Sequence, residues 1–366
     1  MSKAAELANL IGNINAGGGG VNRNVIINGA MNVKQRDNGG FTGVGGSSLY
    51  YLDRWKFDLN NTAGRFSSTQ DSSAPSGFAN SLKLDCTTAD TSIAADELLI
   101  FQQRIEGQNL QTFAKGTSDA KPFAVSFYAK ANASKTYVAE LFDNDNSRQV
   151  AKTFTVGTDW ARHEISLPAD TTGAFGDDAN NSMNLNIWLH AGSNFTSGTL
   201  ATSWSAESAT NRAAGIGSFF SSTDNTFFIT GVQIEVGQNP TEFEHEPYER
   251  TLAKCQRYFY RIQGDDDDMT GIAGYSESTS AARFPIVYPV IMRATPSFEL
   301  SGTCRCQGGT ADGANFTSGL VITNENTNFT ASALRVTGTS NLGAADRGYN
   351  LQFKANTSRI SFDAEL

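Results

Sequence analysis

The sequence is poor in the residues on which most enzymes and metal sites depend. Only three histidines and four cysteines occur among its 366 residues. It also lacks a GxSxG elbow, an HExxH helix, a P-loop and solenoid repeats. These absences exclude the best-known hydrolase, metalloprotease and nucleotide-binding sites, so we expect a protein that is not an enzyme.

Basic charge and long apolar runs are also scarce. Lys and Arg total 28 against 37 Asp and Glu, which gives a net charge of −9 and a pI near 4.9. A surface that neutralises phosphates or docks on anionic lipid needs clustered Lys and Arg, so we expect no nucleic-acid ligand. No apolar run is long enough to span a bilayer and the first residues do not form a secretory signal. We therefore expect a chain made and folded in a cytoplasm, without membrane insertion.

The four cysteines are expected to be reduced and to pack as small hydrophobic side chains. Cys86 and Cys255 stand in apolar surroundings. Cys304 and Cys306 are two residues apart on an expected strand, so their side chains would share one face. A metal bound there would need further ligands, and no second Cys or His pair stands nearby.

Turn residues and Phe predict an all-β fold. Glycine occurs 35 times and Phe 24 times, while Ser, Thr and Asn are abundant between apolar runs. Runs with strand character recur at the short spacing of a β-sandwich, and no long helical period separates them. In the first part of the chain, strands are expected at residues 54–59, 81–86, 98–105, 123–129, 136–142, 150–156, 161–167, 185–190 and 226–236.

A short helix is expected where this first domain ends. Leu252, Cys255, Phe259 and Ile262 recur at helical spacing, which predicts a helix over residues 248–262 with one apolar face.

The chain beyond that helix, residues 263–366, again has the composition of a β domain. At this length two domains are the default, each with its own core. Strands are expected here at residues 284–292, 297–301, 319–323, 333–337, 349–355 and 359–362.

The first 23 residues are expected to form an attachment peptide, helical or extended. Leu7, Leu10, Ile11 and Ile14 make an apolar stripe on a helix too short to be stable alone. A run of glycines follows as a flexible tether. The alternative interpretation is a disordered tail.

Several phrases of the sequence, in order, resemble one family. They are NVIINGAMNVKQR at residues 24–36, YYLDRW at 50–55, GVQIEVGQNPTEFEHEPYERTLAKCQRYFYR at 231–261, RFPIVYPVIMRATPSFEL at 283–300 and FDAEL at 362–366. They are similar to bacteriophage tail-fibre and related virion proteins that carry a jelly roll like that of carbohydrate-binding modules.

The resemblance implies a jelly-roll β-sandwich over residues 24–247, joined by the helix 248–262 to a smaller C-terminal β domain, 263–366. It also implies a virion protein, assembled in the host cytoplasm, and we expect this protein to bind host-surface polysaccharide. The first 23 residues lie outside the resemblance; their apolar stripe leads us to expect that this peptide contacts other virion proteins. By analogy with fibre proteins, a homotrimer is expected.

One loop is the candidate for contact with glycan. Residues 191–217 are rich in Ser, Thr, Gly, Ala and Asn, and Trp204 lies where no core period exists. With Asn194, Phe195 and Asn211 it offers an aromatic face and amides, the groups that bind pyranose rings. The alternative is a tryptophan that pins its loop to the sandwich.

Asp143 and Asp145 are the candidate metal ligands. They place oxygens at alternate positions of a turn between two expected strands, which suits Ca²⁺. The glycine and distal Glu of a helix-loop-helix calcium site are missing, so an Asx-rich turn without any ion is favoured. The acidic run 265–268 is interpreted as a solvated linker tip or as a cation site completed by another chain.

Catalytic carboxylates and histidines are not marked by the sequence. His163 and His190 lie on expected strands and His245 in the phrase that closes the first domain, so all three are interpreted as structural. Glycoside hydrolysis needs two carboxylates facing one cleft, and nothing singles out such a pair.

The sequence therefore predicts a non-enzymatic virion protein, a tail fibre or tail-associated protein that binds host-surface glycan. Two alternatives remain open, a capsid decoration or head-fibre protein and, less favoured, a polysaccharide depolymerase.

Overall fold

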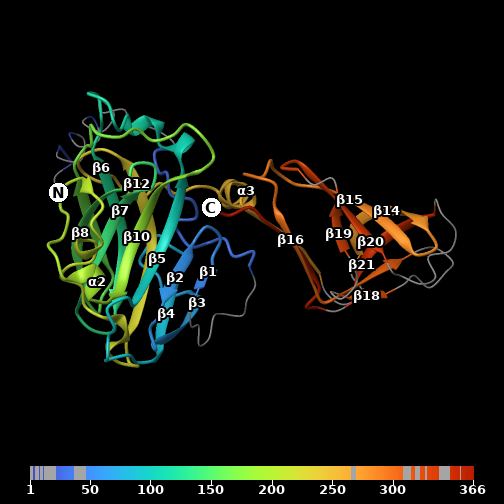
Figure 1. The fold of residues 1–366 in the computed structure, drawn as a ribbon, viewed down its shortest axis with the longest axis horizontal. Helices are drawn as coiled ribbons and strands as arrows, with labels where there is room; N and C mark the ends of the chain where they lie inside the picture. Colours follow the sequence, from blue (N-terminus) through green and yellow to red (C-terminus); the bar gives the residue numbers. More distant parts are fainter. Residues whose placement is uncertain are drawn as a thin grey trace. The chain divides into compact units, whose positions relative to one another are not determined.

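The computed structural model describes residues 3–4, 8, 11, 22–36, 47–264, 269–307, 315–317, 322–325, 328–337, 347–354 and 356–366. The chain divides into two compact units, a first unit of Met1–Thr251 with Leu366 and a second unit of Leu252–Glu365. Figure 1 labels many of their elements. Within these residues no helix is long and apolar enough to cross a membrane.

The first unit is the β-sandwich that the strand spacing predicts. Its seven-stranded sheet has the order β1-β2-β5-β10-β7-β8-β11 and its five-stranded sheet the order β3-β4-β12-β6-β9, with antiparallel pairing (Figure 1). Aromatic and branched residues from both inner faces, such as Phe57, Phe101, Phe127 and Phe227, form one buried core. The bounds are β1 Ser47–Tyr50, β2 Lys56–Asn60, β3 Arg65–Asp71, β4 Ser81–Thr88, β5 Leu98–Glu106, β6 Phe123–Ala131, β7 Lys135–Asp143, β8 Arg148–Val156, β9 Ala161–Leu167, β10 Asn181–Ala191, β11 Ser205–Ala206 and β12 Thr226–Val236.

The segments at residues 24–36 and 50–55 are joined by hydrogen bonds. Asn28 has a left-handed φ of 59°, and its side chain donates to the carbonyls of Val33 and Asp53. The buried indole of Trp55 donates to the carbonyl of Asn28 at 3.0 Å. The Asp53 carboxylate accepts from the backbone and side chain of Gln35 at 2.6 and 2.7 Å. Residues 24–36 and 50–55 are therefore one structural unit.

One glycine allows the opening segment to lie against β12, and a second lies at the bulge of that strand. Val232 N donates to Gly29 O at 3.0 Å, and a Cβ on Gly29 would come within 2.1 Å of the Val232 carbonyl oxygen. Gly231 has φ +64° at the bulge of β12, where a side chain would collide with Phe78. Beyond the bulge, β12 exchanges its partner β4 for this segment, with Val25 N donating to Ile234 O at 3.0 Å.

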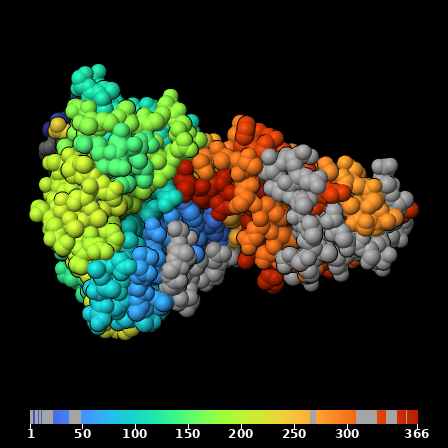
Figure 2. Space-filling view, in the orientation of Figure 1, coloured from blue at the N-terminus to red at the C-terminus, as the bar shows by residue number. Residues whose placement is uncertain are grey.

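The segment between β10 and β12 covers part of the outer face of the seven-stranded sheet. Phe195, Leu200 and Ile216 pack on a second hydrophobic cluster that contains Trp188 and Val138. Figure 2 shows the yellow-green atoms of this segment over one side of the first unit. Short helices occur in this unit at η1 Gly107–Asn109, η2 Gln111–Phe113, α2 Ser193–Thr196, η3 Ala209–Asn211 and η4 Phe219–Ser221.

The linking helix is shorter than expected. Helix α3 runs from Tyr248 to Gln256 and buries Cys255, but residues 259–263 form strand β13. The prediction of a helix through Phe259 and Ile262 is therefore wrong. The β-prone sequence there gains a full antiparallel ladder with β22, which helical spacing alone does not reveal.

The second unit is also built from antiparallel sheets. A three-stranded sheet has the order β13-β22-β16, and a seven-stranded sheet the order β18-β17-β21-β14-β15-β20-β19. Phe284, Leu351 and Phe362 belong to its core, and Cys304 and Cys306 lie buried on one face of β17. The bounds are β13 Phe259–Gln263, β14 Met269–Ser278, β15 Ala281–Val287, β16 Ser297–Ser301, β17 Thr303–Gln307, β18 Asn315–Thr317, β19 Ile322–Glu325, β20 Ala331–Thr337, β21 Gly348–Phe353 and β22 Arg359–Asp363.

The attachment peptide is described at few positions. Ile11 is helical and 49% exposed. Leu7, Leu10 and Ile14 lie outside the described residues, as does the acidic run 265–268.

Candidate functional site

The outward face of the seven-stranded sheet carries two rows of mainly polar side chains, which we call the polar face. Register pairing across β5, β10 and β7 places them in the rows Gln102–Asn186–Glu140 and Arg104–Asn184–Phe142. The neighbours Phe101, Leu185 and Leu141 point into the core, so strand alternation places both rows on the opposite side.

Glu140 is fully buried at the centre of the polar face. The Arg212 guanidinium donates to its two oxygens at 2.9 and 3.0 Å. Asn186 Nδ2 and Trp188 Nε1 donate to Oε2 at 2.8 and 2.9 Å. Burial opposes the charge of Arg212, but attraction to Glu140 outweighs it and raises the pKa of Arg212. The carboxylate thus fixes three neighbouring side chains at once.

Two amide oxygens of the polar face are buried without a hydrogen-bond partner. They are Oδ1 of Asn184 and Oδ1 of Asn186, on residues that are 9% and 1% exposed. The amide of Asn186 cannot turn around, because its NH₂ must face the Glu140 carboxylate. Residues i and i+2 of a strand lie on the same face, so β10 carries both acceptors on one side of the sheet. A buried acceptor without a donor costs free energy that a ligand hydroxyl would recover.

Donors stand beside these acceptors. Lys56 of β2 is the register partner of Gln102 and extends the first row. Burial, and next the positive charge of Arg104, lower the pKa of Lys56. Arg104 Nε donates to Gln102 Oε1 at 3.1 Å. The face therefore carries donors beside acceptors, and Gln102 and Lys56 are themselves buried, at 3% and 4% exposed.

Trp204 pins its loop to the sandwich, the alternative that the sequence left open. Its Nε1 donates to Pro168 O at 2.9 Å, and the ring packs on the main core beside Phe123. Phe195 packs instead against Trp188 in the second cluster.

The two amides predicted with them lie on neighbouring short helices, α2 and η3. Asn194 is exposed on the short helix α2, and Asn211 Oδ1 accepts from Thr199 N at 3.0 Å. Helix α2, which carries Asn194 and Phe195, thus contacts η3, which carries Asn211, whereas Trp204 packs on the main core.

Asp143 belongs to a buried ion cluster that the sequence did not reveal. Lys115 Nζ lies 2.6 Å from Asp143 Oδ2 and 3.1 Å from Asp170 Oδ2. It also donates to the carbonyls of Thr172 and Gly173 at 2.9 and 2.7 Å. We call the four oxygens around this ammonium the ammonium cage.

Asp145 is not part of this cage. Its Oδ2 accepts from Gly176 N at 2.9 Å, while Asp143 Oδ1 accepts from Asn146 N, three residues further on, at 3.0 Å. The Asp143 carboxylate is thus hydrogen-bonded within its own turn, to the backbone and side chain of Asn146. Among the described residues, no group of three or more His, Cys, Asp or Glu side chains is arranged to hold a metal ion.

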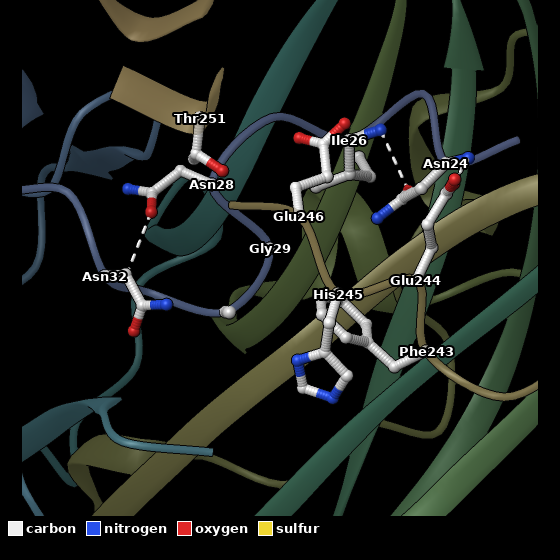
Figure 3. Close-up of a pocket in the computed structure, with 11 residues that line it drawn as sticks. Asn24, Ile26, Asn28, Gly29, Asn32, Phe243, Glu244, His245, Glu246 and Thr251 are labelled. Carbon is white, nitrogen blue, oxygen red and sulfur yellow. Dashed lines mark hydrogen bonds between the residues drawn. The ribbon is translucent and has the colours of Figure 1, made fainter. Parts of the chain in front are cut away.

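A small pocket lies between the opening segment and residues 243–246 (Figure 3). Its polar groups are largely used within the protein. Glu244 accepts from Asn22 N and Asn24 N at 2.6 and 3.0 Å, and Asn24 Oδ1 accepts from Ile26 N. His245 packs against Phe243. This pocket is therefore a structural joint between the opening and closing phrases.

The strand histidines differ in their surroundings. His190 is buried and hydrogen-bonded to Ser218 Oγ and Glu97 Oε2 at 2.8 and 3.1 Å, as the structural interpretation predicts. His163 Nε2 is buried without a partner, and burial lowers its pKa.

The polar face was missed although β10 contains a signal for it. Asn184 and Asn186 alternate with Leu185 and Ile187, the pattern of a strand with one polar face. That pattern does not distinguish a solvated face from a binding face. Whether an amide oxygen on β10 has a hydrogen-bond partner depends on the side chains that the neighbouring strands place beside it.

No protein-family model matches this chain, and no curated protein matches it. Among solved structures, it is similar to the enzymatically active domain of tailspike protein 4 of Bacteriophage CBA120, at 14% identity over 58% of this chain and 21% of that chain, with a TM-score of 0.32. It is also similar to the family 11 carbohydrate-binding module from Clostridium thermocellum in complex with a mixed-linked tetrasaccharide, at 10% identity over 56% and 98% of the two chains, with a TM-score of 0.29. TmCBM61 in complex with β-1,4-galactotriose gives 7% identity over 58% and 99%, with a TM-score of 0.30. The likeness lies in the β-sandwich fold, at low identity.

Proposed function

We propose that this chain is a bacteriophage virion protein, a tail fibre or tail-associated protein, whose first unit binds host-surface glycan on the polar face without cleaving it. The observation that carries the proposal is the pair of unpartnered acceptors on Asn184 and Asn186. The phrases at residues 24–36, 50–55 and 231–261 support the virion assignment through their resemblance to such proteins.

The proposed contact uses hydrogen bonds from sugar hydroxyls to the two amide oxygens. Gln102 supplies a donor to other hydroxyls. Lys56 supplies a further donor once its flexible side chain moves aside. Glu140 holds the amide of Asn186 in place, so the acceptor is ordered before the ligand arrives. Trp204 has no part in this contact, since its ring is packed on the core.

The test replaces Asn184 with Leu and measures adhesion to an array of bacterial surface polysaccharides. Loss of one hydrogen bond in a buried site should weaken binding by roughly tenfold or more. Removing an unpaired acceptor should leave thermal stability unchanged or raised. Asn60→Leu, at the exposed end of β2 in the same sheet, is the control and should bind like the wild type.

Other results would point elsewhere. Equal adhesion of Asn184→Leu and wild type would exclude the polar face as the site. Steady release of oligosaccharide from a bound polysaccharide would favour a depolymerase. Immunogold label on the capsid, with no adhesion to any polysaccharide, would favour a decoration protein in place of a tail protein.

A further inference from the structure

The ammonium cage surrounds a cation that the chain itself supplies. Lys115 and Asp143 are fully buried, and Asp170 is nearly so. A lysine ammonium has three donors, and they are satisfied by Asp143 Oδ2 and the carbonyls of Thr172 and Gly173.

Charge in the cage is balanced by a second cation. Arg148 donates to both oxygens of Asp170 at 2.7 and 3.0 Å. Burial raises the pKa of Asp170, but the hydrogen bonds from Arg148 and Thr172 N, together with the charge of Lys115, outweigh it, so its pKa is lowered overall. Two carboxylates thus face two cations, and neither carboxylate remains uncompensated.

The cage joins segments that are otherwise separate in the sequence. Lys115 follows η2, Asp143 ends β7, and residues 170–173 follow β9. The ammonium also lies 5.1 and 5.2 Å from the ring centroids of Phe175 and Trp204. Trp204 and Asp143, singled out separately by sequence, therefore meet at Lys115.

Two carboxylates and two carbonyls are the ligands that a hard divalent cation takes in proteins. We propose that Lys115 is a built-in replacement for such a cation. It holds the loops at this end of the sandwich, so that the first unit folds without divalent metal from the medium. Once the side chain is shortened, the same oxygens form a site for Ca²⁺.

The test compares wild type, Lys115→Ala and Lys115→Met in full-length protein, each with EDTA or with CaCl₂. Wild-type melting should be the same in both conditions. Lys115→Ala leaves two buried carboxylates with one cation, so its melting temperature in EDTA should fall by roughly 6–20 °C and recover in CaCl₂ with saturation. In Lys115→Met the longer side chain still fills the space, so the melting temperature should fall in EDTA and should not recover in CaCl₂.

Each contrary result overturns the proposal. An EDTA-sensitive wild type would mean that the unit already uses metal. A Lys115→Ala variant as stable as wild type, or destabilised but not restored by Ca²⁺, would reduce the cage to an ordinary buried ion pair.

A labelling experiment on wild type covers the case in which Lys115→Ala does not fold in either condition. Reductive methylation followed by mass spectrometry should spare Lys115 while modifying the exposed Lys152. Equal modification of the two lysines would overturn the cage itself.

Discussion

Replacing Glu140 with Gln should show how strongly one buried carboxylate organises the polar face. Gln has the same shape, but it removes the charge that compensates Arg212 and puts an NH₂ group where donors already converge. Breaking a buried ion pair by removing one partner costs about 3–5 kcal/mol. For a unit of this size that corresponds to a fall in melting temperature of roughly 6–20 °C.

Tryptophan fluorescence is the suitable assay, because the four tryptophans of the chain, at positions 55, 160, 188 and 204, belong to the first unit. Unfolding of the second unit then does not enter the signal, even if the two units unfold separately. Denaturant titration of Glu140→Gln, Arg212→Met and the double variant completes a cycle, which should give a coupling free energy above about 1 kcal/mol.

Glu164→Gln is the matched control. Glu164 pairs with Arg162 but is 41% exposed, so its loss should cost less than about 1 kcal/mol. A similar small cost for Glu140→Gln, or additive effects in the cycle, would refute the reasoning that Glu140 is the centre of the face.

Two further predictions concern titratable groups. Because burial lowers the pKa of His163, the unfolded state binds a proton at a higher pH than the folded state does. The free energy of unfolding should therefore fall as pH drops below about 6.5. His163→Phe should flatten this dependence in thermal melts between pH 7.5 and pH 5, and an unchanged slope would show that the ring is not the group responsible. Burial raises the pKa of Cys304 and of Cys306 to about 12, with each thiol fully buried. At pH 8 neither should react with Ellman's reagent until guanidinium is added, and rapid reaction in native protein would contradict their burial.

The local pattern of apolar and polar residues was sufficient to locate most strands of the first unit. Each of the nine expected ranges overlaps an observed strand, because alternation of apolar residues reports a buried face directly. Strand β3, Arg65–Asp71, was missed because Phe66 is its only large apolar side chain, and β3 lies at a sheet edge. Helical spacing predicts a helix at Phe259 and Ile262 because the spacing of apolar residues contains no information about a partner strand such as β22.

The sequence by itself determined the all-β class, the run of strands and the reduced, buried state of the thiols, since these depend on composition and on patterns within a few residues. Only the tertiary structure decided the candidate site. Asn184 and Asn186 are buried on a sheet face because β5 and β7 flank β10. Trp204 is held by Pro168 and the core, and Asp143 is paired with Lys115, a residue distant in the sequence. Hydrogen-bond satisfaction and charge compensation are properties of groups brought together by the fold, so no local pattern of residues records them.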